Sequence, residues 1–415
     1  MNKNYIQLLE IVKNIMSRTT NFNGTFKERI EFLNDKEYNN IFKPIQIVEK
    51  GNLVLFRYGN YCDVFNGEAD FGKSYTGFWQ AYEGIYRVMR SIVIDISTCQ
   101  IALYPFDKFF NLDEVDETSL DIVQDKIKTA NSIEISDKLD GSMAIARFYN
   151  GELIVTTSKS VMRSQSWRLD EIYKMIEDNS DLLKMIQENP NYTFVFESIT
   201  KADMHVVYYS DSEFGLYLIG MRDMNTFEML SYADIIKFAK KYNVKSTTVF
   251  DKTFDEVINS LDDKKSNEKE GFVLNIDGFY LKIKYNDYVL MHNILSKISS
   301  INLIIKNYAD ETLDDLLSKV PQAYRDRVYT IVNICNQYVT KIENEVDYWY
   351  NIVKDWDKKT IALYLQEHCN KTIMGYVFSK CNGKKYNILK KGTCGYKKLT
   401  DMGYNPKQYY QIFDE

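Results

Sequence analysis

The sequence predicts an α+β domain with substantially antiparallel sheets, followed by an all-α C-terminal domain. Three observations support this fold class. From about residue 45 to 290, short β-type runs mix with turns and helical segments without strict alternation, which is typical of α+β domains. After about residue 293 the β-type runs end. From 323 to 357, apolar side chains recur at gaps of three and four residues, the spacing of a long amphipathic helix. We therefore expect domains at 1–293 and 294–415.

The first 20 residues, MNKNYIQLLEIVKNIMSRTT, are expected to form an amphipathic helix. Tyr5, Leu8, Leu9, Val12 and Met16 share one face of it. The stretch lacks the continuous apolar core and cleavage site of a signal peptide. No apolar run approaches the roughly 20 residues that span a membrane. Six scattered cysteines without a Cys-x-x-Cys pair are typical of reduced thiols. We expect an N-terminal extension to about residue 45, a cytoplasmic location and no membrane partner.

The elements that follow are assigned from composition and periodicity. The strand candidates are NLVLFRYG (52–59), SIVIDIS (91–97), MAIARFYNGELIVTTS (143–158), YTFVFESI (192–199), FGLYLIGM (214–221) and GFVLNIDGFYLKIKY (271–285). The helix candidates between them are SLDIVQDKIKTA (119–130), LDEIYKMIEDNSDLLKMIQEN (169–189) and YADIIKFAKKY (232–242). The aromatic residues of the long C-terminal helix are interpreted as core.

Charge is distributed unevenly along the chain. The net charge is −6, but residues 296–415 hold 18 basic and 14 acidic residues, so the negative balance lies in the first domain. The stretch 380–399, KCNGKKYNILKKGTCGYKKL, has seven lysines, two tyrosines and no acid. Basic residues interleaved with aromatics can hold phosphates and stack bases, whereas a lysine-rich solvated surface would look the same. The candidate nucleic-acid contacts are Lys384, Lys385, Lys390 and Lys391.

The stretch ISDKLDGSMAIARF, residues 135–148, raises the question of what Lys138 does beside an Asp-Gly-Ser turn. Asp-Gly is a strong hairpin signal, so Lys138 could be an ordinary solvated charge on a surface turn. Alternatively, its amine could attack the α-phosphate of a nucleotide and hold the nucleotidyl group as a phosphoramidate. A five-residue motif is too common to decide between them. The decision depends on whether the chain supplies what such a lysine needs.

A lysine nucleophile needs a lowered pKa, cations around the phosphates, a metal for the leaving group and an acceptor for the ribose. The chain contains suitable residues. Lys282 and Lys284 are two apart on an expected strand, so both can point into one cavity. Glu197 and Glu270 adjoin apolar strands, where carboxylates are costly to bury unless they bind something. Further basic candidates are Arg90, Lys108 and Lys159, the last expected on the strand after the turn.

This order of residues resembles the covalent nucleotidyltransferase superfamily of DNA ligases, RNA ligases and capping enzymes, and most closely the bacteriophage RNA ligase 1 family. KLDGS resembles the nucleophile motif, FVFES the third motif, EGFV the fourth, and LKIKYNDYVLMH the fifth with its following helix. DKFFNLDE (107–114) resembles a family stretch that DNA ligases and capping enzymes lack. The resemblance covers about residues 50–295 and continues more faintly through DETLDDLLSKV (310–320).

The resemblance implies a role for each matched residue. Lys138 would form lysyl-AMP, and Arg90 and Lys108 would hold the triphosphate. Lys282 and Lys284 would hold the α-phosphate. Glu197 would contact the ribose, and Glu270 the ribose or a metal. The remaining implied residues are Lys159 and Tyr288, which would line the site, and Asp314 and Asp315, an acidic pair near the metal sites.

The implied function is an ATP-dependent RNA ligase that uses Mg²⁺ and joins a 5′-phosphate to a 3′-hydroxyl. The resemblance also implies tRNA repair in a phage or similar replicon, with a polynucleotide kinase/phosphatase that prepares the ends. One departure lies after the third motif, where the family usually has a proline and then an arginine. Here SITKADMHVVYY carries Lys201, Met204 and His205. A DNA ligase, a capping-type enzyme and a catalytically silent RNA-binding relative remain as alternatives.

Overall fold

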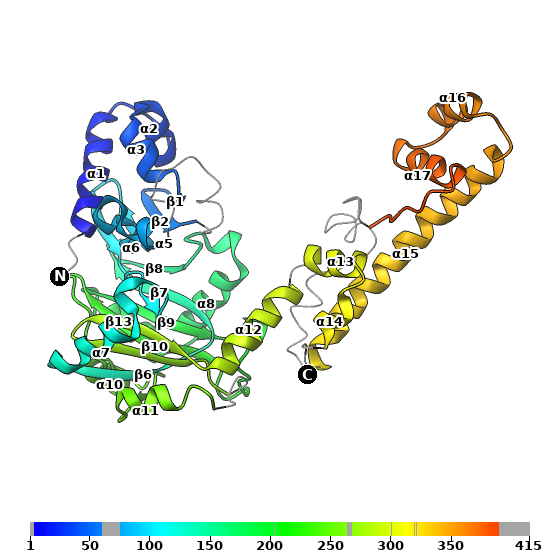
Figure 1. The fold of residues 1–415 in the computed structure, drawn as a ribbon. Helices are drawn as coiled ribbons and strands as arrows, with labels where there is room; N and C mark the ends of the chain where they lie inside the picture. The colour runs from blue at the N-terminus through cyan, green and yellow to red at the C-terminus, as the bar shows by residue number, and fades with distance from the viewer. Residues whose placement is uncertain are drawn as a thin grey trace. The chain divides into compact units, whose positions relative to one another are not determined.

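Three mainly antiparallel sheets build the first part of the chain in the computed structural model (Figure 1). The structure describes residues 4–59, 75–203, 205–263, 268–299, 301–318, 320 and 322–389. The chain divides into two units, Met1–Val289 and Leu290–Glu415, and each is described by itself. The fold class predicted from the sequence, α+β with a helical C-terminal region, is confirmed. None of the helices in the described part of the chain has the length and apolar content that crossing a membrane requires.

The first sheet has the strand order β1-β2-β3-β4 and is covered by the N-terminal helices. Its strands are β1 (Ile45–Lys50), β2 (Leu53–Tyr58), β3 (Arg90–Asp95) and β4 (Gln100–Leu103). The helices before and between them are α1 (Asn4–Arg18), α2 (Phe26–Leu33), α3 (Lys36–Phe42), α5 (Tyr75–Gln80) and α6 (Ile85–Val88). The predicted amphipathic face of α1 is buried through Leu8 and Val12, with Tyr5, Leu9 and Met16 at its margin.

The other two sheets of this unit carry the remaining strands. One has the order β10-β9-β7-β8, and the other β11-β6-β12-β13-β5, in which only the β13–β5 pair is parallel. The strands are β5 (Phe110–Asn111), β6 (Ile133–Lys138), β7 (Ser142–Tyr149), β8 (Glu152–Thr157), β9 (Tyr192–Ile199), β10 (Gly215–Asp223), β11 (Val249–Phe250), β12 (Gly271–Ile276) and β13 (Phe279–Lys284). Helices α7 (Leu120–Thr129), α8 (Trp167–Glu177), α9 (Ser180–Glu188), α10 (Tyr232–Lys241) and α11 (Phe254–Asn259) connect them.

Two of the predicted β-type stretches fold into hairpins at their turn residues. Asn150 and Gly151 join β7 to β8, and Asp277 and Gly278 join β12 to β13, all with positive φ. Positive φ at both central residues is the type I′ geometry that Asn-Gly and Asp-Gly favour. The helix predicted over 169–189 is instead two helices, because Asn179 caps α9 by accepting a hydrogen bond from the backbone N–H of Leu182.

In the second unit every element that the structure describes is a helix. After α12 (Asn286–Ser299), which begins in the first unit, these are α13 (Ile301–Ala309), α14 (Leu313–Leu317), α15 (Gln322–Val353), α16 (Lys358–His368) and α17 (Lys371–Cys381). The long helix predicted over 323–357 is therefore confirmed as α15, four residues shorter at its C-terminal end. Val328, Ile331, Cys335 and Val346 are buried along it, in a core shared with α13 and α17.

Candidate active site

The Asp-Gly turn after Lys138 does not close a hairpin. Strand β6 ends at Lys138 in one sheet, and β7 begins at Ser142 in another. Gly141 passes so close to β9 that an added Cβ would lie 2.4 Å from the carbonyl oxygen of Ser198, so only glycine fits there. Its backbone N–H donates to Oε1 of Glu197 at 3.1 Å. The turn thus carries the chain from one sheet to the other and brings Lys138 near Glu197.

Asp140 fixes this turn in the interior. Its side chain is only 5% exposed. Its carboxylate accepts hydrogen bonds from the backbone N–H groups of Val206 and Val207, at 2.8 and 2.9 Å, and from the Tyr288 hydroxyl at 2.7 Å. The backbone N–H of Asp140 donates to the Tyr209 hydroxyl at 2.9 Å. The surface-turn interpretation of this segment is therefore wrong.

Glu270 lies between two lysines. Its carboxylate is 2.7 Å from Lys138 Nζ and 2.8 Å from Lys284 Nζ, and its side chain is 4% exposed. The strand register explains this arrangement, because Gly271 is opposite Lys138 on β6 and opposite Lys284 on β13. An added Cβ at Gly271 would lie 2.1 Å from a β13 carbonyl oxygen, so the Glu-Gly sequence is required by this close approach.

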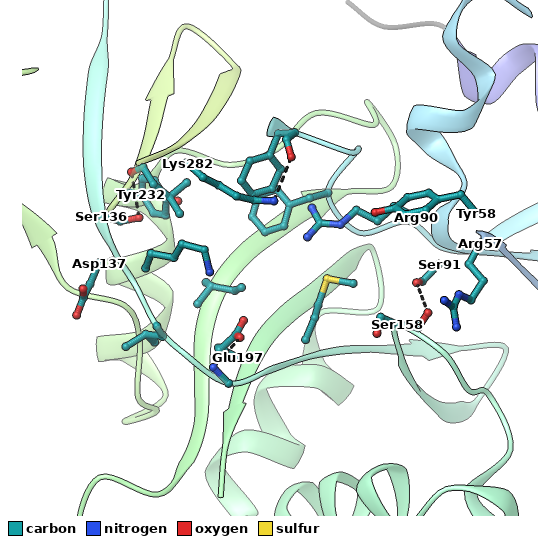
Figure 2. A pocket seen from close by; sticks show the side chains of 18 residues that line it. Arg57, Tyr58, Arg90, Ser91, Ser136, Asp137, Ser158, Glu197, Tyr232 and Lys282 are labelled. Atoms are coloured by element: carbon teal, nitrogen blue, oxygen red, sulfur yellow. Dashed lines mark hydrogen bonds between the residues drawn. The ribbon is translucent and has the colours of Figure 1, made fainter. Parts of the chain in front are cut away.

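A cavity of about 350 Å³ opens beside Lys138 (Figure 2). Strands of all three sheets contribute to its wall. Its charged lining residues are Arg57, Arg90, Asp137, Lys138, Glu197 and Lys282. Its apolar lining includes Phe106, Phe109, Met143, Ile219 and Val273. A pocket of this size and mixed lining is typical of a small-molecule site.

Lys282 is the cation from β13 that lines this cavity. Its ammonium donates to the carbonyl oxygen of Phe109 at 3.1 Å and lies 4.5 Å from the centre of the Phe109 ring. Burial, together with the neighbouring charges of Arg90, Lys108 and Lys138, holds the pKa of Lys282 well below its usual value. Lys282 and Lys284 alternate with buried Leu281 and Ile283, so the predicted two-residue spacing does place both on one face.

Arg90 lines the cavity at the start of β3, whereas Lys108 is held away by other partners. Arg90 donates to the backbone carbonyl of Asp107 at 3.3 Å. Lys108 Nζ lies 3.5 Å from Oε1 of Glu114 and 4.7 Å from the centre of the Phe110 ring. Burial lowers the pKa of Lys108, and Glu114 partly offsets that effect.

Among the other predicted site residues, Glu197 lines the cavity, whereas Lys159, Glu270, Lys284 and Tyr288 do not. Lys159 is exposed in the turn after β8, which ends at Thr157, so its expected place on that strand is wrong. Tyr288 is buried and acts on the site through Asp140. Glu197 lies within β9 rather than at its end. Glu270 precedes β12 as predicted.

The predicted residues of the second unit have exposed side chains where they are described. Asp314 and Asp315 occupy the first turn of α14. Lys384 and Lys385 follow the C-terminal end of α17. Lys390 and Lys391 lie outside the described residues, as does Met204 of the divergent segment. Lys201 and His205 flank Asp203, whose buried carboxylate pairs with Arg168 at 2.6 Å.

Several site residues were not selected from the sequence. Asp140 is one, although it belongs to the quoted motif. Arg57 is another, and its only signal is a basic residue inside the apolar run NLVLFRYG. Tyr209 and Tyr232 carry no local signal, because their positions depend on strands far apart in the sequence.

The two carboxylates give Lys138 a raised pKa in this resting arrangement. Burial by itself would lower it, but the attraction of Glu270 and then Glu197 outweighs that effect. Burial raises the pKa of Glu197 to about 7, against the opposing charge of Lys138 and with a contribution from the like charge of Glu270. Lys138 is therefore an ammonium here, and it must lose its proton before it can attack.

We expect Glu197→Gln to stabilise the protein at pH 8 and to leave its stability nearly unchanged at pH 4.5. A carboxyl whose folded pKa is raised contributes stability that is fully present below its unfolded pKa, near 4.5, and is lost as pH rises through about 7. Glutamine removes this loss, worth about 3 kcal/mol at pH 8. Urea unfolding of both proteins at the two pH values measures it. Glu228→Gln, an exposed carboxylate on a loop, is the control. An equal effect of Glu197→Gln at both pH values would contradict the raised pKa.

Comparisons with known proteins relate part of this chain to one protein family. Residues 88–290 match the model of a family described as RNA ligase. A Thermovibrio ammonificans protein named "Putative RNA ligase" is 24% identical over 293 residues, which are 66% of this chain and 73% of that protein.

The solved structures that resemble this chain include forms of Naegleria gruberi RNA ligase. Two lysine-to-alanine mutants solved with ATP and Mn are 18% and 17% identical, with TM-scores of 0.35 and 0.38. They cover 41% and 46% of this chain, and the chain spans 54% and 58% of theirs. The matched segment 88–290 contains Lys138, Glu197, Glu270 and the two β13 lysines. Residues 88–290 of this chain are therefore similar to the RNA ligase family.

Proposed function

We propose that this protein is an ATP-dependent RNA ligase that seals 5′-phosphate and 3′-hydroxyl RNA ends through lysyl-AMP and RNA-adenylate intermediates. The observation that carries the proposal is the position of Lys138 in the family-matched segment. It lies at the wall of a cavity that Lys282 and Arg90 also line, within reach of buried Glu270. Cations around a phosphate stabilise the charge that develops during nucleotidyl transfer.

In the first step Lys138 Nζ would bond to the α-phosphorus of ATP while the bond to the β-phosphate breaks and pyrophosphate leaves. Lys138 would first give its proton to water, which ends its ion pair with Glu270. Lys282 supplies positive charge beside the α-phosphate, and Glu197 faces the same space to accept hydrogen bonds from the ribose. In the second step AMP moves to the RNA 5′-phosphate and frees Lys138. In the third, the RNA 3′-hydroxyl displaces AMP.

Mg²⁺ fits this site only as an ion held largely by phosphate oxygens. Both Glu270 oxygens face lysines, and the described residues contain no group of three or more His, Cys, Asp or Glu that could hold a metal ion. Mg²⁺ commonly binds through one or two carboxylates and substrate phosphates, and when bound it would neutralise phosphate charge. We propose Glu270 as the protein ligand at this site. The acidic pair Asp314 and Asp315, which lies in the second unit, is proposed separately as a metal-binding pair.

The proposed substrate is RNA. The proposed role is tRNA repair in the cytoplasm of a phage-infected cell, with a polynucleotide kinase/phosphatase acting first. The lysines around the end of α17 support an RNA contact, since Lys384 and Lys385 are exposed. We expect weaker RNA binding when four lysines are changed to alanine, namely Lys384, Lys385, Lys390 and Lys391. The slope of the logarithm of the binding constant against the logarithm of salt concentration should become shallower by up to about four units. Self-adenylylation should be unchanged. Binding isotherms from 50 to 200 mM salt measure this, and an unchanged slope would make these lysines a solvated surface.

The function is tested with wild-type protein, α-labelled ATP and magnesium. A covalent adduct of one AMP, absent with GTP, followed by sealing of nicked RNA, is the expected result. Matched nicked DNA distinguishes a DNA ligase. Such enzymes usually append a β-barrel OB-fold, whereas the described elements after residue 290 are helices. Sealing of DNA alone would overturn the proposal, and no adduct in nucleotide-free protein would favour a silent RNA-binding relative.

A further inference from the structure

A β-bulge in the first sheet places two arginines opposite each other. Strands β2 and β3 pair in an antiparallel register that shifts between Phe56 and Arg57. Phe56 is opposite Ile92, but Arg57 is opposite Arg90, so Ser91 is the extra residue. Ser91 is buried with φ of 71°, an unusual conformation for a non-glycine residue, and its hydroxyl donates to the carbonyl of Ser158 at 3.0 Å. Bulges frequently redirect side chains beside active sites.

The two guanidinium groups lack a counter-ion in the part of the chain that the structure describes. Arg90 contacts the backbone carbonyl of Asp107 and the ring of Phe109. The Asp107 carboxylate is instead 3.5 Å from Arg222. No ion pair joins Arg57 to any described carboxylate, and burial lowers its pKa. Like charges directly opposite each other destabilise a sheet, so this pair is best accommodated when an anion lies beside it.

Both arginines line the cavity that contains Lys138. Figure 2 shows Arg57, Arg90, Ser91 and Ser158 across the pocket from Ser136, Asp137 and Tyr232, with Lys282 on the Tyr232 side of Arg90. The cations of β13, β3 and β2 thus follow one another along one cavity. Guanidinium groups bind phosphate in a bidentate manner and are favoured for it.

We propose that Arg57, together with Arg90, forms an anion site for the terminal phosphates of the nucleoside triphosphate and for the pyrophosphate that leaves. This inference rests on the proposed function, which sets the α-phosphate at Lys138. The β- and γ-phosphates then extend past Lys282 and Arg90 toward Arg57. The arginine pair would hold the leaving group while the bond between the α- and β-phosphates breaks.

The test compares Arg57→Gln and Arg57→Lys with wild type, and uses Arg18→Gln as the control. Arg18 lies on α1, paired with Asp35, and its replacement makes the same change in charge. Calorimetry with inorganic pyrophosphate needs no chemistry. We expect Arg57→Gln to weaken pyrophosphate binding at least about tenfold, consistent with loss of a charge-assisted contact, and Arg57→Lys to weaken it less. The melting temperature of ligand-free Arg57→Gln should equal or exceed that of wild type, because the facing charges are relieved.

Two kinetic assays separate ATP phosphates from RNA phosphates. For Arg57→Gln we expect a higher KM for ATP in self-adenylylation and unchanged sealing of RNA that already carries a 5′-adenylate. Unchanged pyrophosphate affinity would overturn the inference. A lower ligand-free melting temperature with an unchanged KM for ATP would also overturn it, because that result indicates a purely structural role for Arg57. Lost sealing of adenylylated RNA with intact pyrophosphate binding would assign Arg57 to RNA and also overturn it. If wild type forms no adduct, the proposed function fails, while the pyrophosphate measurement still decides the role of Arg57.

Discussion

Lys138→Ala is expected to abolish the covalent AMP adduct. The rate of ATP-dependent sealing should fall at least roughly 10⁴-fold, which is typical of the loss of a nucleophile in covalent catalysis. The reason is that alanine leaves no amine at position 138 to form the phosphoramidate bond. Glu270 keeps its ion pair with Lys284 in the variant, so the fold should lose little stability. Sealing of RNA that already carries a 5′-adenylate should persist, since the third step uses no lysine nucleophile. Gel assays with labelled ATP and with pre-adenylylated RNA measure both quantities.

Lys282 is the competing nucleophile in this experiment. Its pKa is held well below the usual lysine value, whereas that of Lys138 is raised. In the resting site Lys282 therefore gives up its proton more readily than Lys138 does. Peptide mapping of the wild-type adduct therefore decides the matter, and AMP found on Lys282 would refute the assignment of Lys138. Lys237→Ala, an exposed lysine on α10 that pairs with Asp234, is the control and should retain full activity.

Glu270→Gln is expected to lower the free energy of unfolding by about 3 kcal/mol at pH 7.5, because it leaves two lysine ammoniums without their carboxylate. A lysine with a raised folded pKa contributes stability that is fully present below its unfolded pKa, near 10.4, and is lost as pH rises through the folded pKa. The difference between wild type and variant should therefore shrink at high pH. Denaturant unfolding at pH 7.5 and at a series of pH values above about 10.5 measures this change.

The same substitution should also shift the pH dependence of adenylylation. Without the Glu270 charge the pKa of Lys138 falls, so the rise in rate with pH should begin at lower pH than in wild type. The maximal rate should fall if Glu270 also contributes a metal ligand. Glu228→Gln serves again as a control for the charge change. An unshifted pH profile in Glu270→Gln would mean that Glu270 does not control the protonation of Lys138.

The sequence predicted the elements whose signals are local. The apolar spacing of α15 and the alternation that puts Lys282 and Lys284 on one face each depend on a few neighbouring residues. The predictions were wrong where a local signal was interpreted without its tertiary context. The Asp-Gly after Lys138 looks like a hairpin, but the strands it joins belong to different sheets. Lys159 looked like a strand residue, but β8 ends two residues before it.

By itself, then, the sequence determined the fold class and the order of the motif residues around Lys138, because strand and helix periods and turn preferences are properties of short segments. Only the tertiary structure decided that Glu270 joins Lys138 to Lys284, that Asp140 is buried against Val206 and Tyr288, and that Arg57 faces Arg90. These contacts join strands and loops that are up to about 150 residues apart, and register between such segments is set by packing of the whole sheet rather than by local pattern. The protonation of Lys138 follows from those same long-range contacts.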